Sequence, residues 1–325
     1  MVFRQPAEWA PHDAVWIGWP SHPDLWEDDL APARDEVLAF ARAVADGGRG
    51  ERVILVAADA DSAATVPAMP GVETLVEPFG DIWLRDTGPL LLADGTRQRA
   101  ALFGFNWWGG KYHLPGDETL APRLAARAGI EPARHGWVLE GGAIDGDGTG
   151  LAVTTEQCLL NPNRNPSLDR TAIEARLAAD LGIDRLLWLG EGLAHDHTDG
   201  HVDNLARFVR EGRLAIPEPG DGDDPNAAVY RDAAARARAF GLEVVPLPSP
   251  GRIERDGEAV PASYMNFYIG NRAVVVPVYG APNDAAAVAA IGALFPGRTA
   301  IGVRADHLLT GGGSLHCISQ QLPRI

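Results

Sequence analysis

The chain has 325 residues, of which 46% are hydrophobic and 22% are charged, so it has the composition of a globular protein that buries a sizeable core. Its 28 basic and 44 acidic residues give a formal net charge of −16. This charge argues against nucleic acid or an anionic membrane as a partner, because both require a basic surface, but it is compatible with a small cationic substrate.

The cysteine content and the N-terminal residues bear on where the protein works. Two cysteines are too few for a disulfide framework, which favours a reducing compartment. The N-terminal residues MVFRQPAEW lack the basic-then-apolar layout of a signal peptide, and no apolar run is long enough to span a bilayer. We therefore expect a cytoplasmic protein, and the sequence leaves open a homo-oligomeric state.

Taken in chain order, the predicted elements are short apolar strands that alternate with helices. Apolar residues at helical spacing predict helices at residues 30–44, 118–128, 168–181, 227–240 and 284–294. Ser167 and Gly182 are the expected boundaries of the third helix, and Asn226 and Gly241 those of the fourth. Strand-like runs occur at 14–19, 52–57, 186–189, 244–247 and 273–278, and two glycine-containing hairpins pair 138–144 with 151–155 and 205–209 with 213–216.

This alternation predicts the fold class. Two or three strands and one helix recur about every 65 residues over five units, which indicates α/β architecture. A dinucleotide-binding fold is disfavoured, because no Gly-x-Gly-x-x-Gly follows a strand. No linker rich in Ser, Pro or Gly divides the chain, so we expect one domain over residues 1–325.

Four segments place chemically capable side chains within or beside apolar runs. They are GDIWLRDTGP at 80–89, WVLEGG at 137–142, HDHTDGHVDN at 195–204 and GGGSLHCISQQ at 311–321. Taken singly, each has a structural explanation: Asp86 as a turn residue, Glu140 as a solvated carboxylate, His201 as a core histidine and Cys317 as a small buried residue. Taken together, they supply the thiol, imidazole and carboxylates of a single site.

That set of groups suits the hydrolysis of a guanidinium. A carboxylate accepts two parallel N–H groups of such a planar cation, so two aspartates would hold it with its central carbon facing a thiolate. The glycine run before Cys317 allows another molecule to approach closely. A histidine would then carry protons to the leaving nitrogen and from the incoming water, and the substrate's positive charge would favour the thiolate form of Cys317.

The third segment also supports a competing hypothesis, a metal-dependent hydrolase. His195-x-His197-x-Asp199 resembles the metal-binding stretch of metallo-β-lactamase-type hydrolases, except that Gly200 intervenes before His201. A metal site needs three or four ligands, which His113, His135 and His307 would have to complete. This alternative is centred on His195, His197 and His201, whereas a guanidinium-binding protein without catalysis is disfavoured because binding needs no thiol.

Three further residues receive structural predictions. Cys158 follows a strand and has apolar neighbours, which predicts a buried, inert thiol. The segment Trp107-Trp108-Gly109-Gly110 either lines a pocket, because aromatic faces attract cations, or packs in the core. His316 is not the expected base for Cys317, because adjacent residues of a strand point to opposite faces.

The chain resembles the agmatine deiminase family, which is peptidyl-arginine deiminase-like and lies within the larger guanidino-group-modifying superfamily. The resemblance runs nearly end to end. The motifs that carry it are PAEW at 6–9, IWLRDTGP at 82–89, NWWGG at 106–110, LEGG at 139–142, LLNPNRNP at 159–166, TDGHVDN at 198–204, SYMNFY at 263–268, and GGG at 311–313 with HCI at 316–318. Leu84 and Trp107 depart from the residues typical of the family, as does the histidine content before Thr198.

The resemblance implies a five-bladed β/α propeller of pseudo-fivefold ββαβ units and a reaction that needs no metal or organic cofactor. It implies that Cys317 is the nucleophile that forms an amidino-cysteine, that His201 is the general acid and then the base, and that Glu140 orients His201 and contacts the substrate. Asp86 and Asp203 would clamp the guanidinium, with Trp83 as a further substrate-binding residue. The usual reaction of the family converts agmatine and water to N-carbamoylputrescine and ammonia, whereas another guanidino compound or peptidyl-arginine is the alternative substrate. No arginine-rich segment offers itself for an α-carboxylate, which favours a decarboxylated substrate over arginine.

Overall fold

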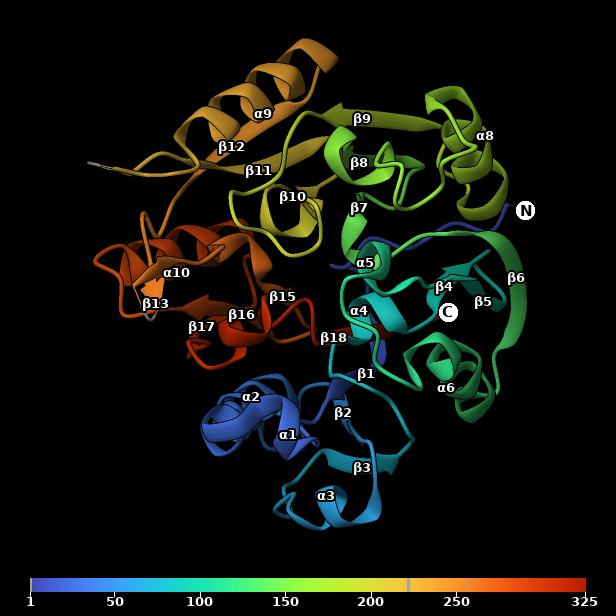
Figure 1. Ribbon diagram of the computed structural model, residues 1–325, viewed down its shortest axis with the longest axis vertical. Helices are drawn as coiled ribbons and strands as arrows, with labels where there is room; N and C mark the ends of the chain where they lie inside the picture. Colours follow the sequence, from blue (N-terminus) through green and yellow to red (C-terminus); the bar gives the residue numbers. More distant parts are fainter. Residues whose placement is uncertain (1, 221–222, 256) are drawn as a thin grey trace.

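Five of the six sheets share one strand pattern (Figure 1). The computed structural model describes residues 2–220, 223–255 and 257–325. In each of the five sheets the first two strands are antiparallel and the strands that follow are parallel. In sheet order the strands are β18-β1-β2-β3 (Ser319–Pro323, His12–Gly18, Arg52–Ala57, Val72–Val76), β4-β5-β6 (Leu90–Ala93, Gln98–Gly104, Glu131–Val138), β7-β8-β9 (Ile144–Gly146, Leu151–Thr155, Arg185–Leu189), β10-β11-β12 (Arg207–Arg210, Arg213–Glu218, Glu243–Pro248) and β15-β16-β17 (Tyr268–Ile269, Ala273–Val278, Thr299–Arg304). The sixth sheet is the two-stranded pair β13-β14 (Glu254–Arg255, Glu258–Ala259).

One long helix connects two parallel strands in each of the five sheets. The helices are α2 (Leu30–Ala45), α6 (Leu120–Ala128), α8 (Arg170–Leu181), α9 (Ala227–Phe240) and α10 (Asp284–Leu294). Figure 1 shows them toward the outside of the molecule, with the first strands of the sheets nearer the middle. All five predicted helices, and the predicted α/β class, are therefore confirmed. The boundary of α8 differs from the prediction, because the side chain of Asp169, and not Ser167, accepts the backbone N–H of Ala172 at the start of the helix.

Short helices make up most of the remaining regular structure. These are α1 (Pro23–Trp26), α3 (Ala60–Ala64), α4 (Leu84–Thr87), α5 (Trp107–Gly110), α7 (Glu156–Leu159) and the 3₁₀ turns η1 (Glu27–Asp29), η2 (Asp46–Gly48), η3 (Asp117–Thr119), η4 (Gly141–Ala143), η5 (Val202–Asn204), η6 (Tyr264–Asn266) and η7 (Leu308–Gly311). Four of them, α4, η4, η5 and η6, immediately precede the first strands β4, β7, β10 and β15, and a turn at residues 315–318 precedes β18 in the same way. We call these five segments the leading turns.

The leading turns carry the predicted site residues. Asp86, Glu140 and Asp203 each lie four residues ahead of the first residue of the following strand. Backbone hydrogen bonds connect turns of neighbouring sheets: the Arg85 N–H donates to the carbonyl of Cys317 at 3.0 Å. Because these residues occupy the same place relative to the first strand of their sheet, residues far apart in sequence lie in one region of the molecule.

The predicted strand at 138–144 is wrong over most of its length. The strand β6 ends at Val138 and β7 begins only at Ile144, so residues 139–143 form a turn. A Cβ at Gly141 would lie 2.1 Å from the carbonyl oxygen of Arg85, so only glycine permits this close approach of two backbones. The turn carries Glu140 into the interior, where it is fully buried, which excludes the interpretation as a solvated hairpin carboxylate.

The first sheet joins the two ends of the sequence. The strand β18 pairs antiparallel with β1, with Ile17 opposite Ser319 and Trp16 opposite Gln320. Both strands lie in the largest cluster of buried apolar side chains, which also includes Cys317. Within the described residues, no helix has the length and apolar character that crossing a membrane would require.

Candidate active site

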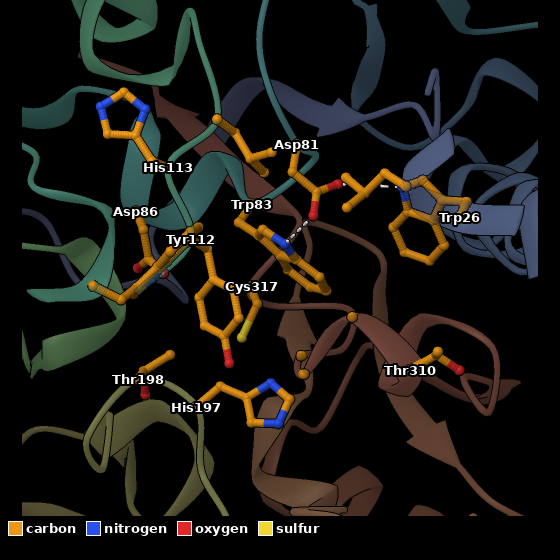
Figure 2. Close-up of a pocket in the computed structure, with 16 residues that line it drawn as sticks. Trp26, Asp81, Trp83, Asp86, Tyr112, His113, His197, Thr198, Thr310 and Cys317 are labelled. Carbon is orange, nitrogen blue, oxygen red and sulfur yellow. Dashed lines mark hydrogen bonds between the residues drawn. The ribbon is translucent and has the colours of Figure 1, made fainter. Parts of the chain in front are cut away.

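The thiol of Cys317 lies at the wall of the pocket shown in Figure 2. The pocket has a volume of about 290 Å³ and its lining includes Trp83, Asp86 and the glycines 311–313. The expectation of an accessible cysteine needs correction, because Cys317 is only 5% exposed. The glycine run permits the close packing beside it: a Cβ at Gly313 would lie 2.5 Å from the Trp83 ring and 3.0 Å from the Cys317 Cβ.

Asp86 and His201 approach each other behind the pocket wall. Asp86 accepts hydrogen bonds from the Gly142 N–H and from the indole N–H of Trp108, both at 2.9 Å. The His201 Nδ1 atom lies 3.7 Å from Asp86 Oδ2, and both side chains are buried. Burial alone would lower the pKa of His201, but the charge of Asp86 raises it well above its usual value, which favours the protonated ring. Burial also raises the pKa of Asp86.

Asp203 is the carboxylate that contacts the Cys317 thiol. The thiol donates to Asp203 Oδ2 at 3.5 Å, and the Asn266 amide donates to the sulfur at 3.0 Å. Burial, followed by the negative charges of Asp203 and Asp86, raises the pKa of the Cys317 thiol well above its usual value. The thiol form of Cys317 is therefore favoured in the free protein, whereas a cation bound between the carboxylates would favour the thiolate.

Glu140 is held by an arginine that the sequence analysis did not select. The Arg164 Nε–H donates to Glu140 Oε1 at 2.6 Å, and the rest of the guanidinium is bound by Asp199 and by the carbonyl of Thr198. Burial would lower the pKa of Arg164, but the charge of Glu140 raises it. Its only signal in the sequence is the conspicuous run NPNRNP, from which no contact with Glu140 follows.

Several buried polar atoms of this cluster have no hydrogen-bond partner among the described residues. They are Glu140 Oε2, His201 Nδ1 and Nε2, and Asp203 Oδ1. An unpaired buried polar group is costly, so natural proteins retain such groups where a ligand completes the bonding. The donors and acceptors that remain therefore mark the place of a polar, cationic ligand.

The histidines of the metal hypothesis do not converge. The only group of potential ligands among the described residues is Glu140, Cys158 and His201, whose donor atoms lie within 4.8 Å of one another. His197 lines the pocket, while His195 belongs to neither set. The ligand set His195, His197 and His201 is therefore wrong. Cys158 is buried as predicted, but it lies beside His201, and burial raises the pKa of its thiol.

The remaining histidines have structural partners or line the pocket mouth. His135 pairs with Asp180 at 3.1 Å and His307 pairs with Asp29 at 2.5 Å. His113 stacks on Trp107, with ring centroids 3.8 Å apart, and lines the pocket. Of the two tryptophans at 107–108, Trp108 also lines the pocket, as one of the two interpretations of this segment expected.

Two tryptophans form one wall of the pocket, and a single carboxylate orients both of them. Asp81 accepts the indole N–H of Trp83 at 2.6 Å and that of Trp26 at 3.2 Å, as the dashed lines in Figure 2 show. Burial raises the pKa of Asp81 to about 6. Trp83 thus presents its ring to the same pocket as Cys317, which is the position expected of a substrate-contacting residue.

Gly142 provides a sharp test of this arrangement. A Cβ there would lie 2.6 Å from His201 Nδ1, 3.0 Å from Asp86 Oδ1 and 3.2 Å from Asp203 Oδ2, so Gly142→Ala must displace at least one of these side chains. We expect turnover to fall by about 100-fold, since a displacement of about 1 Å in a site has such an effect. Steady-state kinetics would measure it. The matched control is Gly136→Ala, where an added Cβ meets nothing; equal activity of the two variants would contradict the geometry.

Comparison with known proteins gives a consistent result. The sequence model of the Porphyromonas-type peptidyl-arginine deiminase family matches residues 4–323. Agmatine deiminases of Stutzerimonas stutzeri and Pseudomonas putida are 37% and 36% identical to this chain, over 99% of it and 95% of each relative. The structure of the Enterococcus faecalis agmatine deiminase superposes with a TM-score of 0.92 at 32% identity, over 99% of this chain and 96% of that one.

A more distant structure shows how far the fold extends. A DDAH from Pseudomonas aeruginosa has a TM-score of 0.53 at 13% identity and covers 96% of this chain, which shows a shared fold alone. The family expected from the sequence motifs is confirmed by the full-length matches. The chain belongs to the Porphyromonas-type peptidyl-arginine deiminase family and groups there with agmatine deiminases.

Proposed function

We propose that this protein hydrolyses a guanidino group through a covalent amidino-cysteine, most simply converting agmatine and water to N-carbamoylputrescine and ammonia. The observation that carries the proposal is the convergence of Asp86, His201 and Asp203 next to the Cys317 thiol, with polar atoms left unpaired. A guanidinium supplies N–H donors to the carboxylate oxygens and a positive charge that balances their negative charge. The relatives and neighbours named agmatine deiminase support the same substrate class.

The positions of the residues are compatible with the roles that the family resemblance implies. Asp86 and Asp203 would hold the guanidinium, and its charge would lower the thiol pKa, so that Cys317 loses its proton to solvent and the thiolate attacks the guanidino carbon. His201 in its protonated form would give its proton to the leaving nitrogen, which departs as ammonia. The neutral imidazole would then take a proton from the attacking water, and expulsion of the sulfur leaves the carbamoyl product, whose extra proton returns to the thiolate. Glu140, anchored by Arg164, would orient His201 and contact the substrate. No step uses a metal or an organic cofactor.

We further propose that the five sheets are the blades of one five-bladed β/α propeller and form a single catalytic domain over residues 1–325. The support is the common strand pattern of the sheets, the one connecting helix in each, and the pairing of β18 with β1. In this arrangement the five leading turns surround the axis and so supply the site. The pseudo-fivefold ββαβ unit accounts for the recurrence seen in the sequence.

The pocket favours a small substrate without a carboxylate. Within the part of the chain that the structure describes, its lining contains no lysine or arginine that would pair with an α-carboxylate. Its volume of about 290 Å³ is at the lower end of small-molecule sites and is small for a peptide. Trp26, Trp83 and Tyr112 give it the apolar walls that suit an aliphatic tail.

A side-by-side assay of agmatine, arginine and a peptidyl-arginine substrate tests the proposal. We expect kcat/KM for agmatine to exceed that for arginine by at least about 100-fold, since burying an unpaired carboxylate costs several kcal/mol. Release of ammonia and formation of the carbamoyl product would be measured together. Preference for arginine or the peptide would overturn the substrate assignment, and absence of turnover with every guanidino compound would overturn the function.

A further inference from the structure

His316, the neighbour of the proposed nucleophile, bridges two buried carboxylates. Its Nδ1 lies 2.8 Å from Asp203 Oδ2, and its Nε2 lies 2.8 Å from Glu8 Oε2. It precedes β18 in a leading turn and not in a strand, so the strand argument used for it in the sequence does not apply. Both ring nitrogens are nevertheless engaged, and neither is available as a base for the Cys317 thiol.

The two contacts determine the protonation state of the ring. An ionised carboxylate only accepts hydrogen bonds, so each ring nitrogen must carry a proton, and the ring is then an imidazolium. The His316 side chain is 3% exposed, and those of Asp203 and Glu8 are 0% and 6% exposed, so water does not substitute for either contact.

Two arginines also lie against the carboxylates that His316 contacts or faces. Glu8 also accepts a hydrogen bond from Arg207 at 2.6 Å, Arg207 binds Asp145 at 2.8 Å, and Arg85 lies 3.9 Å from Glu8. The three carboxylates are thus matched by two arginines and His316. The charged and titratable groups that face His316 are Glu8 from the N-terminal segment, Arg85 on α4, Asp145 on β7, Asp203 on η5, Arg207 on β10 and the adjacent Cys317.

The bridge reaches the reacting groups through one oxygen. Asp203 Oδ2 accepts from His316, from the Asn266 amide at 3.4 Å and from the Cys317 thiol at 3.5 Å. These contacts leave Asp203 Oδ1 buried and without a partner among the described residues. Burial would raise the pKa of Asp203, but the hydrogen bond and charge of His316 lower it. The carboxylate is therefore both ionised and fixed in orientation.

We propose that His316 is a positioning residue that remains a buried imidazolium between Glu8 and Asp203 and keeps Asp203 ionised and oriented toward the guanidinium. The role depends on the proposed function, because it is defined by what Asp203 binds. It also assigns a task to Glu8 near the N-terminus, which fixes the far side of the ring.

The dependence of kcat/KM on pH with agmatine tests the proposal in His316→Asn. Asparagine keeps a donor toward Asp203 but has no charge, so the pKa of Asp203 rises and the carboxylate becomes protonated at a higher pH. We expect the acid limb of the profile to move upward by about one pH unit or more. At pH values above the displaced acid limb, the variant should regain part of its activity. A uniform loss at every pH, without a displaced limb, would mean a merely structural role and would overturn the proposal.

His12→Asn is the matched control. His12 is equally buried and contacts a carboxylate, Glu51, at 2.9 Å, but it lies outside the site. Its acid limb should coincide with that of the wild type. A similar displacement in both variants would show that loss of any buried histidine produces the effect, and would contradict a specific role for His316.

A second measurement reads the protonation of the His316 ring directly and does not depend on the activity of a variant. In wild-type protein labelled with ¹⁵N-histidine, the His316 ring should show two protonated nitrogens at pH 7, because each ring nitrogen faces a carboxylate oxygen. The signal is assigned by its absence in His316→Asn or, if that variant does not fold, in His316→Gln. A neutral ring at pH 7 overturns the proposal. This readout is independent of turnover, so a wild type inactive on guanidino compounds would overturn the proposed function and leave the charge state of His316 to be judged separately.

Discussion

Cys317→Ala will lose turnover of agmatine by a factor on the order of 10⁴ or more, because no other group is placed to attack the guanidino carbon. Binding of agmatine should persist, because Asp86 and Asp203, the carboxylates proposed to hold its guanidinium, remain in the variant. Ammonia release measures the first effect, and calorimetric titration with agmatine measures the second.

The other cysteine provides the control for this experiment. Cys158→Ala removes a buried thiol that has no place in the proposed reaction, and we expect it to retain turnover within about tenfold of the wild type. Mass spectrometry of acid-quenched wild-type protein should detect the amidino adduct on Cys317 only. Activity that survives Cys317→Ala and disappears with a chelator would instead establish metal-dependent hydrolysis.

His201→Gln will lower kcat for agmatine by about 10²- to 10⁴-fold, the usual contribution of a general acid–base group. Glutamine fills similar space and donates a hydrogen bond to Asp86, but it transfers no proton to the leaving ammonia or from water. KM should change much less, because the carboxylate clamp is retained. Burst kinetics would locate the defect, since formation and hydrolysis of the amidino-cysteine both need the imidazole.

His195→Gln separates the two hypotheses for the histidine-rich segment. His195 lies six residues before His201 but does not line the pocket, so the thiol mechanism predicts activity close to that of the wild type. The metal hypothesis, in which both histidines are ligands, predicts comparable losses in both variants. Equal, severe losses in His195→Gln and His201→Gln would therefore contradict the roles assigned here.

The fold was largely predictable because its local signals are strong. Apolar periodicity is clear in α6 and weakest in the alanine-rich α10, and α6, α8 and α9 end at glycines with positive φ, as C-terminal caps usually do. The recurrence of one layout also revealed the five units. The strand expected at 138–144 failed because its sequence is apolar, whereas the turn there is imposed by contact with the backbone of Arg85, which no local pattern encodes.

The site was predictable in its residue types but not in its supporting contacts. Asp86 and Glu140 stand beside apolar runs, and His201 and Cys317 stand in short segments rich in glycine and polar side chains, which is how a functional residue becomes visible in one sequence. The contacts of Arg164 with Glu140 and of Asn266 with Cys317 join residues more than 20 positions apart, so no local pattern predicts them. The thiol pKa could not be foreseen either, because it depends on burial and on carboxylates from other sheets.

The pairing of β18 with β1 has a thermodynamic consequence for the active population. The turn that holds His316 and Cys317 leads directly into β18, and Glu8 precedes β1. The pairing of these two strands, which are far apart in sequence, therefore fixes both ends of the hydrogen-bonded group that runs from Cys317 through His316 to Glu8. Local opening of this strand pair removes Cys317, the proposed nucleophile, from its partners while the other four sheets stay intact. The active fraction therefore depends on the free energy of opening the β18–β1 pair, which can be smaller than the free energy of unfolding the whole protein.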